Sequence, residues 1–236
     1  MSPHDFFFFV SKELKIGGPE PYISNTALLY AFNMIDKIRR NVAGVKPFYD
    51  CDRKFFTIYA TPARIREEIM VIGNHICNKN HRIVSDLVKV TYNSVIESYI
   101  TLMEQKGVVI PKLGFYMKYP PLTTFEFFIL TRRNVRLPKV IRIGKKFPPA
   151  RVYYEELQFE FKSGKFRPHH PVNILDLPKE RTRILRGLFI SMIPAPLLVD
   201  CLLEGKYIKA RDKEGHNYNI AVPDEKRYPR VFGNAE

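Results

Sequence analysis

The chain has 236 residues, a length that suits one domain with additions or two small domains. Apolar residues make up 45% of it, enough for a buried core, but no apolar run is long enough to predict a membrane-spanning helix, and three scattered cysteines exclude a disulfide framework and indicate a reducing compartment. The 38 basic residues outnumber the 24 acidic ones, and the resulting net charge of +14 favours a polyanionic partner whose binding depends on salt.

Residues 1–56 are interpreted as an N-terminal extension with one helix. A breaker cluster at Gly17–Pro21 precedes Ser24, a suitable N-cap for a helix that continues to Arg40 with apolar residues at helical spacing. The apolar run near the start is either part of the core or an anchor in a neighbouring subunit, and it consists of Phe6, Phe7, Phe8 and Phe9.

Residues 57–168 are expected to form the central domain. Thr61-Pro62 begins one helix and a longer helix runs from Ile83 to Gln105, so that the two make a helical hairpin. After Gly107 the pattern changes to that of strands, with a tight hairpin up to Tyr116, a long β stretch from Phe125 to Ile143 and a last strand over Phe159–Lys162.

Residues 169–236 are expected to form a helical and β-hairpin extension. His169 and His170 lie between prolines and are interpreted as an exposed linker. Pro178 begins a helix that continues to Met192, and a short helix covers Pro196–Leu203. Gly205–Val222 is typical of a β-hairpin that turns at residues 212–215.

The order of these elements, with Gly107–Tyr116 and Phe161-Lys162-Ser163-Gly164-Lys165 as motifs, resembles the HU / integration host factor (IHF) family. The resemblance implies an α+β fold, an IHF/HU-like helical hairpin plus three-stranded antiparallel sheet with a long β-arm. It also implies an intertwined dimer whose arms enter the DNA minor groove and kink it with a proline at each tip, here Pro138. The arm lacks the family's glycines and threonine, and Pro168 and Pro171 interrupt its third helix.

No catalytic motif is present, and the sequence is interpreted as that of a protein that is not an enzyme and has no cofactor, no small-molecule substrate and no membrane partner. His75, Cys77 and His81 have a spacing that resembles a metal site. Because a fourth ligand is not apparent, they are interpreted as ordinary packing and capping residues, and no metal is expected.

Basic side chains along the expected arm and the last strand form the candidate binding site. Arginine suits phosphate and a narrow minor groove, but a charged protein–protein or solvated surface is the alternative. The candidate residues are Arg132, Arg133, Arg136, Pro138, Lys139, Arg142, Lys145, Lys146, Lys162 and Lys165.

Two functions follow from the resemblance. The long, Tyr/Phe-rich chain with extensions at both ends resembles the IHF-like virion proteins of crAss-like tailed bacteriophages, which implies a structural ring or connector protein of the tail or collar that assembles as a homo-oligomer with other virion proteins. The alternative is a DNA-bending architectural protein that binds double-stranded DNA through the arm residues.

Overall fold

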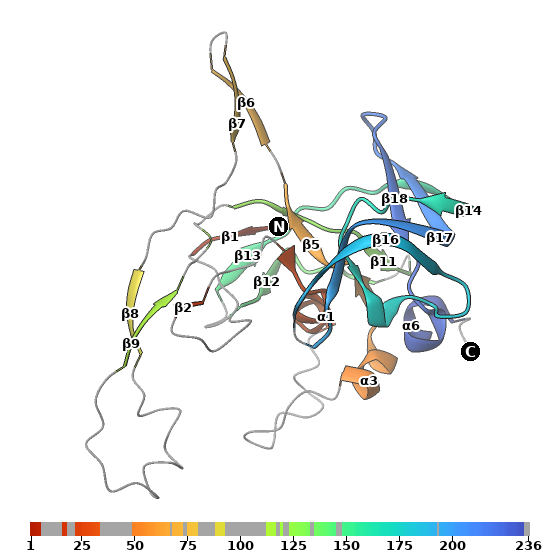
Figure 1. Ribbon diagram of the computed structural model, residues 1–236, viewed down its shortest axis with the longest axis horizontal. Coiled ribbons are helices and arrows are strands. Elements are labelled where there is room, and N and C mark those ends of the chain that lie inside the picture. Colours follow the sequence, from red (N-terminus) through yellow and green to blue (C-terminus); the bar gives the residue numbers. More distant parts are fainter. Residues whose placement is uncertain are drawn as a thin grey trace, which may run out of the picture.

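The computed structural model is built mainly of β-strands, and its helices are few and short (Figure 1). None of the helices in the described ranges is long and apolar enough to cross a membrane. The structure describes residues 1–5, 16–17, 22–33, 49–66, 68–72, 75–79, 88–92, 112–116, 119, 123–132, 135–144, 148–192 and 194–233.

The first part of the body packs short strands around one helix. Leu28 and Phe32 of that helix contact the inward side chains of Ile58, Phe125 and Ile141 in a common core. The sheets are β1–β13–β12, β10–β5–β3 and β11–β4. Their elements are β1 (Ser2–Pro3), β3 (Tyr22–Ile23), α1 (Asn25–Asn33), α3 (Tyr49–Asp52), η1 (Arg53–Phe55), β4 (Ile58–Ala60), β5 (Ala63–Ile65), β10 (Phe125–Glu126), β11 (Ile129–Thr131), β12 (Val140–Arg142) and β13 (Pro149–Arg151).

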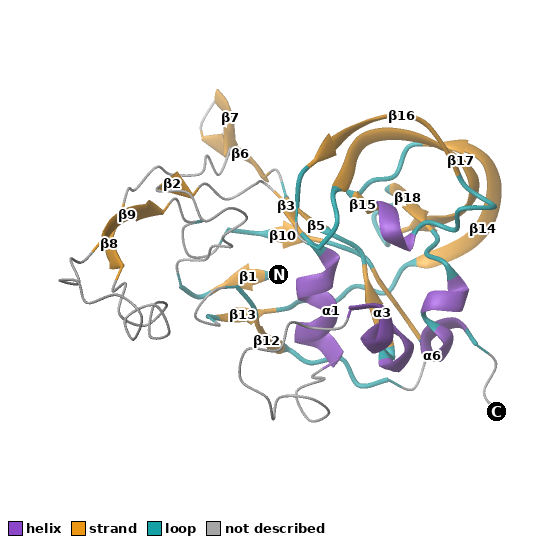
Figure 2. Cartoon of the chain, turned by 60° about the horizontal axis from the view of Figure 1, so that its bottom comes forward, coloured by secondary structure: helices purple, strands orange, loops and turns teal. Residues whose placement is uncertain are grey.

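The second part of the body is a five-stranded sheet centred on the longest strand, β17 (Figure 2). Leu203 pairs with both Phe166 and Ile184, which places β14 and β16 on opposite edges of β17. The elements of this part are β14 (Gln158–Phe166), β15 (Val172–Asn173), η2 (Ile174–Asp176), β16 (Arg183–Ile190), β17 (Leu197–Arg211), β18 (Asn217–Ala221), η3 (Glu225–Arg227) and α6 (Pro229–Phe232).

Two smaller sheets lie away from this body in Figure 1. One is a hairpin of two strands, and in the other a short strand pairs in parallel with β9. Their elements are β2 (Ile16–Gly17), β6 (Glu68–Ile72), β7 (His75–Lys79), β8 (Val88–Tyr92) and β9 (Lys112–Tyr116).

The helix predicted after Ser24 is confirmed at its start. The Ser24 hydroxyl accepts a hydrogen bond from the backbone N–H of Thr26 (3.3 Å), which satisfies one of the free donors of the first turn. At the other end the Asn33 amide donates to the Ile58 carbonyl (2.8 Å) and its oxygen accepts from the Thr57 N–H (2.8 Å), so this side chain ties α1 to β4. Residues 34–40 lie outside the described residues.

The predicted helical hairpin is wrong, and with it the α+β IHF/HU-like fold class. Strands β5, β6 and β7 occupy the first predicted helix, and β8 lies within the second. Isoleucine and valine, which make up three of the five residues of β6, are stiff at χ1 and favour strands. Gly73-Asn74 between β6 and β7 is a dipeptide typical of a two-residue hairpin connection.

The two helices predicted after Pro178 and Pro196 are also wrong, because β16 and β17 occupy those segments. Leu197, Leu198 and Val199 are all buried, so this part of β17 is covered on both faces. A strand buried on both faces has a continuous apolar run without alternation, which does not distinguish it from a buried helix.

The predicted β-arm is wrong as well, because its residues divide among β10, β11 and β12, which belong to three different sheets. The strand over Phe159–Lys162 is confirmed as part of β14, and the hairpin over Gly205–Val222 is confirmed as β17 and β18. The division of the chain at residues 56 and 168 stays a prediction.

Candidate nucleic-acid interface

Strand β14 forms an exposed edge of the large sheet. It pairs along its whole length with β17, and no other strand in the described part of the chain pairs with it. Only Phe166 of its nine residues is buried. Its side chains are therefore available to a binding partner on both faces.

Two phenylalanines lie exposed side by side on one face of β14. Phe159 and Phe161 are two residues apart and are 64% and 53% exposed. Their ring centroids are 5.9 Å apart with an interplanar angle of 89°. Phe161 pairs with Ile208 of β17, which is buried, so the two rings extend beyond the edge of a core. Such rings lose water favourably when a flat apolar surface covers them.

Lysines lie beside the aromatic pair. The Lys206 ammonium on β17 is 4.5 Å from the centroid of the Phe161 ring, a cation–π contact. Its carboxylate neighbour Glu225 is 3.9 Å away across the surface. Lys165 shares the face of the two rings, since residues an even number apart on a strand point the same way. The β14 surface is defined here as Phe159, Phe161, Lys165 and Lys206.

Lys162 lies on the opposite face of β14. Its ammonium is 2.8 Å from the Glu160 carboxylate, a contact that raises the pKa of Lys162 and lowers the pKa of Glu160. Lys209 is the cross-strand partner of Glu160. The charge on this face is thus partly compensated, as that of Lys206 is by Glu225, and it is the aromatic pair that makes the other face the better site for a nucleic acid.

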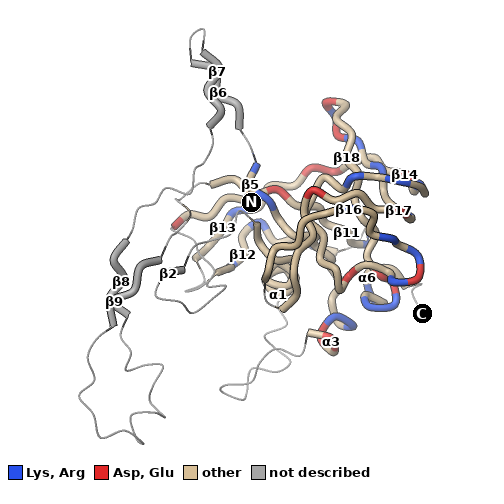
Figure 3. Tube along the Cα trace, viewed as in Figure 1, with Lys and Arg blue, Asp and Glu red and all other residues tan. Residues whose placement is uncertain are grey.

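A second group of basic residues lies on and near β12 and β13, where the chain is coloured blue in Figure 3. Arg142 and Arg151 are exposed, while Ile141 and Ala150 between them point into the core. Arg136 and Lys139 are exposed in the segment that leads to β12. The β12–β13 surface is defined as Arg136, Lys139, Arg142 and Arg151.

The structure therefore divides the predicted binding residues among several places. Lys165 belongs to the β14 surface and Lys162 to its reverse face, while Arg136, Lys139 and Arg142 lie near β12 beside the half-buried Pro138. The Arg132 guanidinium donates instead to the carbonyl of Gly233. The predicted residues outside the described part of the chain are Phe6, Phe7, Phe8, Phe9, Arg133, Lys145 and Lys146.

Neither Phe159 nor Phe161 was predicted as a site residue from the sequence, nor was any residue of β17. The Phe159-Glu160-Phe161 alternation was the available signal, because aromatic residues two apart on a strand share a face. Lys206 is separated from Phe161 by 45 residues in the numbering, and only the β14–β17 register brings them together.

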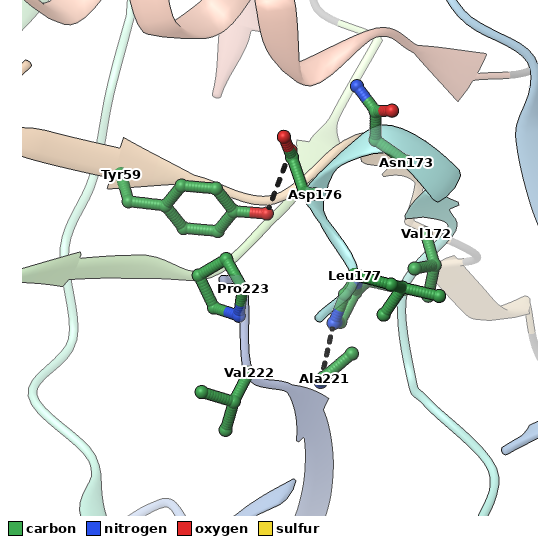
Figure 4. Close-up of a pocket in the computed structure, with 9 residues that line it drawn as sticks. Tyr59, Val172, Asn173, Asp176, Leu177, Ala221, Val222 and Pro223 are labelled. Carbon is green, nitrogen blue, oxygen red and sulfur yellow. Dashed lines mark hydrogen bonds between the residues drawn. The ribbon is translucent and has the colours of Figure 1, made fainter. Parts of the chain in front are cut away.

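A small pocket lies between Tyr59, η2 and the end of β18 (Figure 4). The Asp176 carboxylate accepts hydrogen bonds from the hydroxyls of Tyr228 (2.7 Å) and Tyr59 (3.3 Å), and burial raises its pKa. The His170 Nε2 accepts from the Ala221 N–H (3.1 Å). These polar groups are satisfied within the chain, so the pocket is structural. The predicted exposed linker at His169-His170 is wrong, because His170 is buried.

At the tip of the β17–β18 hairpin, a carboxylate, an imidazole and a phenol are hydrogen-bonded to one another, as acid–base groups in enzymes often are. Asp212 accepts hydrogen bonds from the His216 ring (2.9 Å) and the Tyr218 hydroxyl (3.0 Å). It also accepts from the backbone N–H of His216 (2.8 Å), as a carboxylate that closes a turn does. Among the described residues, no group of three or more His, Cys, Asp or Glu side chains is placed to hold a metal ion.

A family model described as the type I-D CRISPR-associated protein Cas5/Csc1 matches residues 1–230. No curated protein matches the chain.

This match overturns the resemblance to the HU / integration host factor family and to the virion proteins. The roles inferred from that resemblance are corrected with it: the phage ring protein, the DNA-bending alternative, the virion partners and the virion location. The Phe-x-x-Gly-Lys motif on which that resemblance depended is present in the sequence. In the structure it is a segment of β14, and its glycine, Gly164, adopts a φ of 140°.

Proposed function

We propose, because the chain belongs to the type I-D CRISPR-associated Cas5/Csc1 family, that it is an RNA-binding subunit of a CRISPR effector complex. Cas5 family proteins work in such complexes with other Cas proteins and CRISPR RNA, in the cytoplasm of the host cell. In this role the chain holds a single-stranded part of the CRISPR RNA.

The exposed pair of Phe159 and Phe161 is the observation that carries the proposal. Unpaired bases stack on exposed aromatic rings whatever their sequence, and nearby lysines attract the phosphates. The β14 surface offers both, with two rings 5.9 Å apart and the Lys206 ammonium over one of them. A duplex hides its base faces inside the helix, so this surface suits a single strand.

The chain is further proposed to bind RNA without cleaving it. The Asp212–His216 pair is the described group best able to transfer a proton, but His216 is exposed at a hairpin tip and its partner carboxylate closes the turn. A test incubates end-labelled RNA with the purified protein, with and without EDTA. Intact RNA is expected, whereas cleavage that His216→Ala abolishes would make the chain a nuclease.

The binding proposal is tested by replacing both rings, Phe159→Ala with Phe161→Ala, and measuring the affinity for a fluorescent single-stranded RNA by anisotropy. Each lost stacking contact costs about 1–3 kcal/mol, so the affinity should fall at least about tenfold.

Phe189→Ala is the matched control for this experiment. Phe189 is 63% exposed, as Phe159 is, but it lies on β16 at the opposite edge of β17. Its replacement should leave the affinity for RNA unchanged. Equal affinities of the double variant and the wild type would refute RNA binding at the β14 surface.

A further inference from the structure

Strand β16 presents a further exposed surface, which is mainly apolar. Its sequence, Arg183-Ile-Leu-Arg-Gly-Leu-Phe-Ile190, has four exposed apolar side chains, of which Leu188 and Phe189 are 64% and 63% exposed. Successive side chains of a strand point to opposite faces, so these apolar residues lie exposed on both faces of β16, as on an edge strand that a further strand can join. The β16 surface is defined as Ile184, Leu185, Leu188 and Phe189, with Arg183 and Arg186.

The backbone of β16 is also available to a partner. In the described part of the chain β16 pairs with β17 alone, so its other edge carries N–H and C=O groups that a further strand can meet. Gly187 lets β16 pack closely on β17, since a Cβ atom there would lie 2.7 Å from Leu198 Cδ1 and 2.8 Å from Cys201 Cβ. One edge of β16 is thus held against β17, and the opposite edge is the one open to a partner.

The side chains of β16 indicate which partner fits. Isoleucine and leucine have no flat π-face on which a base could stack, which disfavours RNA. The strand has two arginines and no acidic residue; Arg183 lies 4.0 Å from Glu204 of β17, and the exposed Lys179, Glu180 and Arg181 precede the strand. Antiparallel pairing sets the start of one strand against the end of the other, so a second copy would meet like charge at Arg186, near the middle of the strand, which costs free energy. An apolar segment that carries carboxylates complements both features.

We infer that the β16 edge binds an extended, apolar segment of a different protein chain, which adds a strand to the sheet and places acidic residues near Arg183 and Arg186. Strand addition of this kind takes its affinity from main-chain hydrogen bonds and its specificity from alternate side chains. The inference rests on the proposed function in one respect: the partner is sought among the other subunits of the effector complex.

The two surfaces can be occupied together, because β14 and β16 pair with opposite edges of β17. The chain would then connect RNA at one edge of its sheet to a protein subunit at the other. Hence RNA binding and assembly can be disrupted separately.

The test is amide hydrogen exchange of β16, measured in the purified chain, in the chain with CRISPR RNA alone, and in a complex co-expressed with the other type I-D effector subunits. Exchange at β16 should slow by at least about tenfold in the complex and stay unchanged with RNA alone.

In a second arm, Leu188→Ser with Phe189→Ser should lower incorporation into the complex about tenfold. Tyr153→Ser, at a 72% exposed residue outside the β14, β12–β13 and β16 surfaces, is the control and should leave incorporation unchanged.

Other outcomes would overturn the inference. Protection of β16 by RNA alone would make the surface an RNA site. A homodimer of the purified chain that the double serine variant dissociates would make it a self-association site. Unchanged exchange in a complex that contains the chain would leave β16 without a partner. If the serine variant fails to fold, the exchange measurement on the wild type decides alone. Loss of RNA affinity in the variant at Phe159 and Phe161 reports on the proposed function separately.

Discussion

His170 illustrates how one side chain joins two distant segments. Its Nε2 accepts a hydrogen bond from the Ala221 N–H (3.1 Å), which leaves the proton on Nδ1, where it is donated to the carbonyl of Pro171 (2.6 Å). Burial lowers the pKa of His170 to about 4. The flanking prolines suggested a linker, but a sequence does not reveal that two backbone groups will be placed to satisfy both ring nitrogens.

The buried neutral imidazole predicts a pH-dependent stability. An unfolded chain binds a proton at His170 near pH 6.5, whereas the folded chain binds it only near pH 4, so the free energy of unfolding falls as the pH drops through that window. The loss due to His170 should reach about 3 kcal/mol. The measurement is urea unfolding of the wild type and of His170→Gln at pH 6.5 and at pH 4. The difference in unfolding free energy between the two proteins should shrink by this amount at the lower pH. Because other groups titrate alike in both proteins, a constant difference would contradict the neutral imidazole.

At the scale of elements, local patterns predicted β14 and the β17–β18 hairpin but failed for β16 and the start of β17. The alternation around Phe159 and the turn before Gly215 gave β14 and the β17–β18 hairpin correctly. The apolar segments of β16 and the start of β17 were predicted as helices, since Pro178 suits the first turn of a helix and neither segment alternates. Burial of Leu198 on both sides of the sheet is a tertiary property, and an apolar run alone does not show it.

The close approach of β16 to β17 predicts that Gly187 does not tolerate a side chain. The Cβ atom of Gly187→Ala would lie 2.7 Å from Leu198 Cδ1 and 2.8 Å from Cys201 Cβ, which forces the two strands apart. Overpacking of this kind costs about 1–3 kcal/mol of unfolding free energy. Urea unfolding should detect it, with Leu188→Ala as control, because Leu188 is exposed and its truncation should cost less than about 0.5 kcal/mol. Equal stability of the two variants would mean that β16 does not press on β17.

At the scale of the whole molecule, the net charge agrees with the proposed RNA partner, whereas the motifs pointed to the wrong family. The net charge of +14 indicated a polyanion. Of the lysines predicted on this strand, Lys165 belongs to the proposed β14 surface and Lys162 to its reverse face, and the Lys206 contact with Phe161 depends on the pairing of two strands. The order of weak motifs pointed to a DNA-binding family, because similar short turns and strand ends occur in unrelated folds.

The division of the positive charge between two surfaces predicts how RNA binding depends on salt. Each phosphate contact of a single strand contributes about −0.7 to the slope of log affinity against log salt concentration. Lys165→Gln with Lys206→Gln should therefore reduce the slope by about 1.4 for any RNA that covers the β14 surface.

The length of the RNA should determine whether the second surface contributes. Arg151 and Gln158 are seven residues apart, so the chain between the β12–β13 and β14 surfaces spans at most about 24 Å. An RNA of about 6 nucleotides should occupy the β14 surface alone, and one of about 20 should also reach Arg142 and Arg151. We expect Arg142→Gln with Arg151→Gln to flatten the salt dependence of the longer RNA and not of the shorter one. If both RNAs respond to this variant alike, a single continuous surface binds them; if neither does, the arginines of β12 and β13 serve another partner.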